Sequence, residues 1–302
     1  MSRLYEALQR ADLERKASPT PEAEQDVDPV LIPEVEEPPT TKPELDIEQI
    51  AQRAWKPSIV AFPTLADRGE GVEQFRSLRS RIFQARYEAP LKTILISSGM
   101  PAEGKSFIAA NLAMSLARNS VNNILLIDGD LRRPTIHSLL GAPNAPGLSE
   151  YLAGTAELPE VMQRDRTARQ IGTGGVGGVT NLTFIPAGIC GDNSSELAAN
   201  HRMEKLVAAL APHFDWILID TPPALAFADA IDIARLADAV LLVARGATTP
   251  YDVAQRAQAA FSNSRILGFV LNAVKDAPRN TYYYYGNQEP AGGSHKRKDK
   301  RQ

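Results

Sequence analysis

The chain has 302 residues, 43% of them hydrophobic, which is enough for one large domain or two small ones with a sizeable core. A single cysteine, Cys190, excludes an intramolecular disulfide framework, and no apolar run approaches the ~20 residues that a membrane-spanning helix needs. Because the N-terminal stretch MSRLYEALQRADLERK is too charged for a signal peptide, we expect a soluble, cytoplasmic protein. A net charge of −3 argues neither for nor against a nucleic-acid partner, and none is expected.

Residues 1–17 are predicted to form a short amphipathic helix, because Met1, Leu4, Tyr5, Leu8 and Ala11 follow the i, i+3, i+4, i+7 spacing. This helix is either a solvated segment, marginal on its own, or a docking helix for a partner, and both interpretations stay open. Residues 18–56 are expected to form a disordered linker. Within it, residues 18–49 hold seven prolines and ten acidic residues against one lysine, so there is little apolar surface to offset the entropy of ordering.

Residues 57–276 are predicted to form the folded domain. A helical pattern covers residues 71–86, and short apolar runs then alternate with helical stretches. The apolar runs span residues 92–97, 123–128, 182–186, 215–220, 239–244 and 266–272. Most are continuously apolar, which indicates strands buried on both faces, and the helices between them indicate right-handed crossovers. We therefore expect an α/β fold with a doubly wound, mostly parallel sheet and helices on both faces, followed by a tail over residues 277–302.

The sharpest motif is GMPAEGKS, which fits G-x-x-x-x-G-K-[ST], follows the run KTILIS and precedes a helical stretch. In that context the motif predicts a phosphate-binding P-loop, whose backbone N–H groups and helix N-terminus face the phosphates. A lysine then reaches the terminal phosphates and a serine hydroxyl ligates Mg²⁺. The residues expected to bind nucleotide here are Gly99, Met100, Pro101, Ala102, Glu103, Gly104, Lys105, Ser106 and Phe107.

Acidic residues end two of the other predicted strands. WILID ends at Asp220, which fits the Mg²⁺-holding aspartate of P-loop enzymes, and NILLIDGDLRRP carries Asp128 and Asp130. One acid after a strand is often a helix cap or a turn residue. Three of them on strand ends of one sheet, together with a P-loop, favour a ligand site, because ligands bind at the carboxyl ends of such strands.

The chain resembles the bacterial tyrosine kinases of the CpsD/CapB type, also called BY-kinases, over roughly residues 57–285. The resemblance rests on an ordered set of features: Glu73-x-x-Arg76-x-x-Arg79, the P-loop, LLIDGDLRRP, ILIDTPP and the tyrosine cluster Tyr282, Tyr283, Tyr284 and Tyr285. Two features depart from the family pattern. The P-loop has Ala102 where the family usually has glycine, and GDNSSEL over residues 191–197 lacks the proline of N-P-S-E-L.

The resemblance implies ATP and Mg²⁺ as cofactors. It places Lys105 on the transferring phosphoryl group, Ser106 and Asp220 on Mg²⁺ with Asp128 nearby, and Asp128 or Asp130 on the tyrosine hydroxyl. Asn272, at the end of ILGFVLN, either contacts adenine or is simply a polar strand end. Cys190 has no catalytic base paired with it in the sequence and is expected to be inert.

The resemblance also implies partners. Tyr282–Tyr285 would be phosphorylated in a neighbouring subunit's site, and Glu73, Arg76 and Arg79 would contact that neighbour in a ring-like homo-oligomer, although intrahelical ion pairs are the simpler interpretation. A separate transmembrane activator, the polysaccharide co-polymerase, would recruit the kinase to the inner face of the membrane, where it would regulate exopolysaccharide export. The alternative is a partition or division-site ATPase that positions or assembles a complex without phosphorylating protein. Met100 counts against it, because those ATPases carry a lysine directly after the first P-loop glycine.

Overall fold

The computed structural model describes residues 50–57, 60–66, 68–118, 121–166, 179–189 and 201–274. The predicted N-terminal helix, the segment GDNSSEL, Cys190 and the tail with its tyrosine cluster lie outside the described residues. Within the described ranges, no helix combines the length and the apolar character needed to cross a bilayer.

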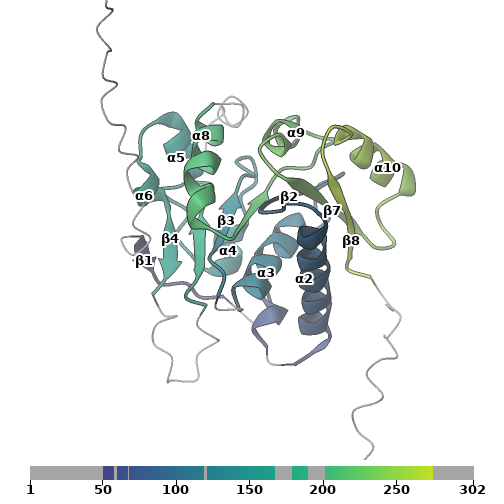
Figure 1. The fold of residues 1–302 in the computed structure, drawn as a ribbon, viewed down its shortest axis with the longest axis horizontal. Helices are drawn as coiled ribbons and strands as arrows, with labels where there is room; N and C mark the ends of the chain where they lie inside the picture. The colour runs from purple at the N-terminus through teal and green to yellow at the C-terminus, as the bar shows by residue number, and fades with distance from the viewer. Residues whose placement is uncertain are drawn as a thin grey trace, which may run out of the picture. The chain divides into compact units, whose positions relative to one another are not determined.

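One sheet of eight strands organises the described part of the chain, in the order β1-β4-β5-β3-β6-β2-β7-β8 (Figure 1). Its strands are β1 (Ala51–Arg53), β2 (Thr93–Ser98), β3 (Ile124–Asp128), β4 (Gln163–Asp165), β5 (Leu182–Ile185), β6 (Trp216–Asp220), β7 (Ala239–Arg245) and β8 (Ile266–Asn272). All neighbours are parallel except β4 and β5. The carboxyl ends of the six strands from β5 to β8 therefore share one edge, where a ligand site is expected.

Helices cover both faces of this sheet. The first face packs against α2 (Glu70–Glu88), α3 (Lys105–Ala117) and α4 (Ile136–Leu140), and the second against α5 (Leu148–Ala153), α6 (Leu158–Val161), α8 (His201–Leu210) and α9 (Asp229–Ala234). α10 (Tyr251–Ala260) follows β7, and η2 (Pro63–Leu65) and η4 (Ala211–His213) are short 3-10 turns. Because side chains alternate along a strand, Ile94 and Ile96 join the core of the first face, while Leu95 joins that of the second. The expected doubly wound, mostly parallel α/β fold is confirmed.

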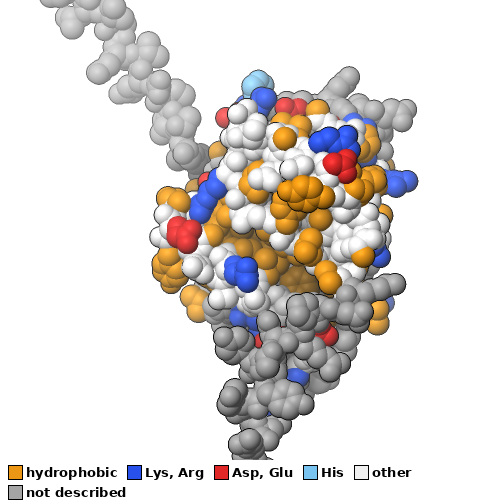
Figure 2. Space-filling view, turned by 90° about the vertical axis from the view of Figure 1, so that its right-hand side faces the viewer, with side chains coloured by type: hydrophobic (Ala, Val, Ile, Leu, Met, Phe, Trp, Pro, Cys, Tyr) orange, Lys and Arg blue, Asp and Glu red, His pale blue; other side chains and the backbone are white. Residues whose placement is uncertain are grey.

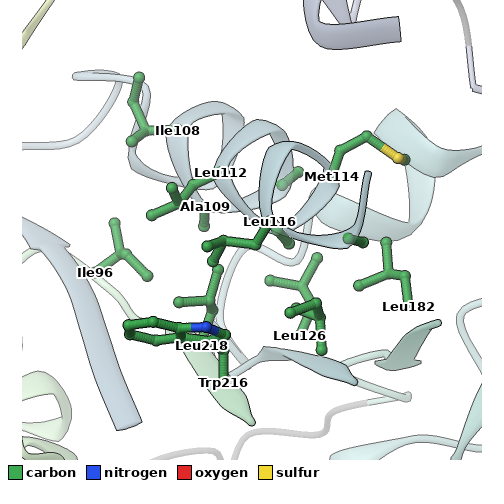
Figure 3. Close-up of a cluster of buried hydrophobic side chains, with 14 of the residues drawn as sticks. Ile96, Ile108, Ala109, Leu112, Met114, Leu116, Leu126, Leu182, Trp216 and Leu218 are labelled. Atoms are coloured by element: carbon green, nitrogen blue, oxygen red, sulfur yellow. The ribbon is translucent and has the colours of Figure 1, made fainter. Parts of the chain in front are cut away.

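Helix α3 is the most deeply buried helix of the first face. Eleven of its residues are buried, since its sequence KSFIAANLAMSLA is apolar on nearly all sides. Figure 3 shows Leu112 and Leu116 of α3 pointing toward Leu218 and Trp216 of β6. Close packing of this kind holds the first turn of α3, and therefore the P-loop before it, in a fixed position above the sheet.

The sheet begins earlier in the chain than the sequence predicts. Residues 50–56 were expected to belong to the linker, but Ala51–Arg53 form β1, paired with β4. Trp55 is buried, its ring meets Phe184 edge-on at 6.1 Å, and its Nε1 donates to Gln163 at 3.1 Å. The linker boundary at residue 56 is therefore too late, because the tertiary packing of one tryptophan orders a segment whose own sequence carries no strand pattern.

At the other end of the sheet, β8 is the last of the described strands and pairs with β7 alone among them. Its residues are half-buried or exposed, and Leu271 is 65% exposed. Figure 2, which views this side of the molecule, shows hydrophobic side chains gathered over its middle. The six apolar runs predicted as strands correspond to β2, β3, β5, β6, β7 and β8.

Candidate active site

The P-loop connects the end of β2 to the start of α3. Gly104 has φ +92°, and a Cβ there would lie 2.0 Å from Nδ2 of Asn272, so only glycine fits this position. A Cβ at Gly99 would lie 3.0 Å from Val253 of α10. The first backbone N–H groups of α3 lack partners within the helix, as at every helix N-terminus, and this leaves them free to bind an anion.

Lys105, the first residue of α3, reaches across the sheet edge to the end of β3. Its Nζ lies 2.6 Å from Oδ2 of Asp130, and both side chains are largely buried, with 12% and 3% exposed. The other oxygen of Asp130 accepts a hydrogen bond from the backbone N–H of Arg133 at 3.0 Å. The P-loop lysine and the second acidic motif are therefore in direct contact, although 25 residues separate them.

Asp128 and Asp220 lie side by side at the ends of two neighbouring strands, because β3 pairs with β6 in a register that puts them opposite each other. Both are fully buried. Oδ2 of Asp128 accepts a hydrogen bond from the backbone N–H of Ile136 at 3.1 Å. Among the described residues, Oδ1 of Asp128 and both oxygens of Asp220 have no partner with hydrogen-bond geometry.

Crowding of these carboxyl groups changes their acidity. Burial, followed by repulsion from Asp220, raises the pKa of Asp128 well above its usual value. Burial likewise raises the pKa of Asp220 to about 6, although attraction from Lys105 and a contribution from the nearby Ser106 hydroxyl act in the opposite direction. Burial alone would lower the pKa of Lys105, but the carboxylates around it, first Asp220 and then Asp130, outweigh burial and raise it.

Three unpartnered carboxylate oxygens next to a serine hydroxyl match the hard oxygen ligands that Mg²⁺ prefers. The described residues contain no group of three or more His, Cys, Asp or Glu side chains already arranged around a metal position. That is compatible with Mg²⁺ at a nucleotide, because this ion keeps several waters and uses only one or two carboxylates plus substrate phosphates. Ser106, Asp220 and Asp128 therefore fit such an ion.

Other residues expected at the site lie close to it but are engaged elsewhere. The ring of Phe107 packs on Phe75 of α2 at 6.1 Å. The amide of Asn272 donates to the carbonyl of Glu103 at 2.9 Å and accepts from the backbone N–H of Ala273. Its contact with adenine stays a prediction. Pro101 and Ala102 are exposed at the tip of the P-loop.

The residues expected at a subunit contact lie on α2. Arg76 and Glu73 form an exposed intrahelical ion pair at 2.5 Å. Arg79 instead turns onto α3, where it donates to the carbonyl of Ser115 at 2.6 Å. Burial, together with the nearby charges of Arg76 and Arg118, lowers the pKa of Arg79. The intrahelical interpretation thus describes the first two residues, and a subunit contact stays a prediction.

Two sets of contacts around the site had no signal in the local sequence. Arg132 pairs with Asp229 of α9 at 2.9 Å and lies over the ring of Phe227 at 4.1 Å, which links the exit of β3 to the exit of β6. Thr249, before α10, donates to the buried Glu103 of the P-loop. Such partners lie about 100 to 150 residues apart in the chain, so no short motif contains both.

Comparison with known proteins yields consistent relatives, although no family model matches the chain. The chain is 32% identical over 219 residues to the tyrosine-protein kinase YwqD of Bacillus subtilis, a match that covers 72% of this chain and 87% of YwqD. It is also 32% identical over 219 residues to the putative tyrosine-protein kinase CapB of Staphylococcus aureus, covering 72% of this chain and 90% of CapB.

The third relative is longer. The chain is 36% identical over 217 residues to the tyrosine-protein kinase Etk of Escherichia coli, which covers 70% of this chain but only 28% of Etk. The solved kinase domain of Etk superimposes with a TM-score of 0.63 at 33% identity, covering 76% of this chain and 85% of that domain. The matched part of Etk is thus its kinase domain.

Proposed function

Since this chain belongs to the bacterial tyrosine kinase family and is a protein-tyrosine kinase, we propose that it transfers the γ-phosphoryl group of ATP to the cluster Tyr282–Tyr285 of a second copy. The observation that supports this proposal is the contact between Lys105 and Asp130 beside two buried carboxylates, whose remaining oxygens have no hydrogen-bond partner among the described residues. A structural ion pair would not need unpaired carboxylates next to it, because each of them costs free energy.

The P-loop supplies the phosphate site. Backbone N–H groups at the end of the loop and in the first turn of α3, from Gly104 to Ser106, face the phosphates, and Lys105 leaves Asp130 to place its charge on the γ-phosphoryl group. Ser106 and Asp220, with Asp128 beside them, would hold Mg²⁺, which when bound would supply positive charge to the phosphate oxygens. Because these groups are positioned before the reaction by α3 and the sheet, they act mainly by orientation and electrostatic stabilisation.

The acceptor side of the reaction needs a base. The phenol oxygen of the tyrosine attacks the γ-phosphorus, ADP leaves, and the phenol proton passes to a carboxylate. We assign this role to Asp128, because its buried Oδ1 has no hydrogen-bond partner among the described residues and lies beside the P-loop lysine's partner Asp130. Asp130 remains the alternative, since departure of Lys105 would free its Oδ2.

The wider biological role rests on the resemblance alone. We propose that the kinase regulates exopolysaccharide synthesis and export as a ring-like homo-oligomer, at the inner face of the membrane, with a separate transmembrane activator. A ring would raise the effective concentration of each tail at a neighbouring site. The exposed Glu73–Arg76 pair on α2 is available for such a contact, and Arg79 could join it after leaving Ser115.

Transfer between two copies can be tested by mixing inactive and tail-less variants. Lys105→Met provides an acceptor that lacks activity, and a variant with Phe at all four positions Tyr282–Tyr285 provides an active donor that lacks the acceptor. Neither should label its own tail with Mg·ATP, whereas the mixture should show phosphate on the tail of the Lys105→Met protein, located by mass spectrometry.

Two other tyrosines serve as internal controls for this experiment. Tyr87 is 91% exposed, and Tyr151 is half-buried with the guanidinium of Arg202 4.8 Å from its ring centre. Phosphate found mainly on Tyr87 or Tyr151 would reject the tail as acceptor. Label confined to wild-type protein, with none in the mixture, would reject transfer between copies.

A further inference from the structure

Glu103 is an unusual member of the P-loop, because its carboxylate is buried while the residues on either side are not. Glu103 is 3% exposed, whereas its neighbour Ala102 is exposed at the tip of the loop. The carboxylate accepts the backbone N–H of Met100 at 2.7 Å and the hydroxyl of Thr249. A buried carboxylate persists only when strong hydrogen bonds compensate for its lost hydration.

These contacts join the P-loop to a distant part of the chain. Thr249 also accepts the backbone N–H of Arg245 at 2.8 Å, and the guanidinium of Arg245 donates to the carbonyl of Ala102 at 3.3 Å. Asn272 at the end of β8 donates to the carbonyl of Glu103 at 2.9 Å. Residues at the end of β7, just after it and at the end of β8 therefore bind three groups of the loop: the Ala102 carbonyl, the Glu103 carboxylate and the Glu103 carbonyl.

The order of the strands places these contacts on one side of β2 and the proposed catalytic carboxylates on the other. From β2, which leads into the P-loop, β6 and β3 lie on one side and carry Asp220, Asp128 and Asp130. β7 and β8 lie on the other side and provide Thr249 and Asn272. The Glu103 side chain thus points to the side of the loop opposite the acids that Lys105 contacts.

The loop also contains a strained residue. Ala102 has φ +64°, in the left-handed region that L-residues other than glycine seldom adopt. It stands where the resembling kinases usually have glycine, so this chain needs other contacts to keep the loop in that conformation. Two hydrogen bonds next to the strained residue are such contacts: one from Arg245 to the carbonyl of Ala102, and one from the N–H of Met100 to the carboxylate of Glu103.

We propose that Glu103 is a positioning residue that, through Thr249, holds the P-loop in its nucleotide-binding conformation and offsets the strain at Ala102. This inference rests on the proposed function only in taking Gly99–Ser106 as the nucleotide site. In this proposal the Glu103 carboxylate binds Met100 and Thr249 rather than the nucleotide. It acts through the backbone N–H of Met100 and through the shape of the loop between Gly99 and Gly104.

A double-mutant cycle with Mg·ADP as the probe tests the pair. Glu103→Ala and Thr249→Val should each raise the Kd for ADP about tenfold, as expected for loss of a buried, charge-assisted hydrogen bond. The double variant should bind ADP no more weakly than the weaker-binding single variant, because both single changes remove the same Glu103–Thr249 hydrogen bond. Thr248→Val, at the exposed neighbouring threonine, is the matched control and should bind ADP as wild type does.

The backbone strain at Ala102 allows a second, independent test. Ala102→Gly should improve ADP binding more in the Glu103→Ala background than in wild type, since glycine removes the need for the clamp. Additive single effects, or equal gains in both backgrounds, would overturn the inference. Should Glu103→Ala fail to fold, Thr249→Val breaks the same contact from outside the loop, and an unchanged Kd in that variant would overturn it as well.

These outcomes are separable from failure of the proposed function. ADP binding does not depend on the acceptor, so the cycle keeps its meaning if Tyr282–Tyr285 are not phosphorylated. Phosphotransfer should follow the same pattern, with the KM for ATP rising in Glu103→Ala and Thr249→Val while kcat changes less than twofold. A fall in kcat with unchanged KM would instead place Glu103 in the chemical step and reject its positioning role.

Discussion

The two ends of strand β6 carry the same residue type in opposite states. At its amino end, Asp215 accepts the backbone N–H of Asn123 at 2.7 Å. At its carboxyl end, Asp220 is fully buried, both of its oxygens lack hydrogen-bond partners among the described residues, and its pKa is raised to about 6. One strand thus holds a carboxylate that stabilises the fold and a carboxylate that the fold leaves available.

The same contrast extends across the sheet. Near the amino edge, Asp238 accepts the backbone N–H groups of Lys92 and Thr93 at 2.7 and 2.8 Å, at the start of β2. This edge also carries a groove of about 740 Å³, lined by residues such as Arg86, Val207 and Leu236. The proposed site therefore does not lie in this groove. It lies at buried carboxylates whose oxygens lack partners among the described residues, a cost that a fold tolerates where a ligand completes them.

The largest expected effect on phosphotransfer comes from removing the charge of Lys105, at the carboxyl edge of the sheet. Lys105→Met should lower phosphotransfer about 10³-fold or more, because it removes the positive charge that stabilises the transferring phosphoryl group. The side chain is not part of the hydrophobic core, so the circular dichroism spectrum should be unchanged. Wild-type phosphotransfer at saturating Mg·ATP would show that the P-loop assignment is wrong.

The carboxylates of the two ends can be compared directly by kinetics. Asp128→Asn and Asp220→Asn should each lower kcat about 10²- to 10³-fold through lost metal binding and charge stabilisation. Asp215→Asn should change kcat less than twofold, because an asparagine oxygen can still accept the N–H of Asn123. Equal losses in all three variants would point to misfolding and would remove the distinction between the two edges.

The free energy of unfolding should depend on pH through Asp220, at the carboxyl edge of the sheet. Asp220 has a pKa of about 6 in the folded chain, against about 3.9 when unfolded, so the folded protein binds more protons between these values. Its contribution therefore favours folding at low pH and is lost as pH rises through about 6. Asp220→Asn should stabilise the ligand-free protein by on the order of 2 kcal/mol at pH 8, and by much less at pH 4.

Thermal unfolding in buffer without divalent cations measures this difference. A shift of about 4–8 °C at pH 8 is expected for a domain of this size. Mg·ADP should raise the melting temperature of wild type and leave Asp220→Asn nearly unchanged. A variant that is destabilised at pH 8 would mean that Asp220 is a structural carboxylate like Asp215.

Local patterns account for most of the fold and for the cluster of charged residues at the carboxyl end of the sheet. The six long strands were predicted because each is an apolar run, and Lys105, Asp128, Asp130 and Asp220 because each stands in a short motif at or just after the end of such a run. β1 and β4 were missed because both are only three residues long and mostly polar, AQR and QRD, and form through tertiary pairing. The Glu103–Thr249 contact was missed for a related reason, since 146 residues separate its partners.

The smallest expected effect comes from the amino edge. Asp238→Ala removes the acceptor for two backbone N–H groups at the start of β2, so it should lower the free energy of unfolding by about 1–3 kcal/mol. Asp238→Asn keeps an oxygen acceptor there and should lose less than half as much. Both variants should retain kcat within twofold at temperatures well below melting, because no proposed site residue lies at this edge. Denaturant unfolding and steady-state phosphotransfer on the same samples make the test. If Asp238→Asn lowered kcat as strongly as Asp220→Asn while leaving stability intact, the amino edge would also take part in chemistry, and unused carboxylate oxygens would no longer distinguish the two ends.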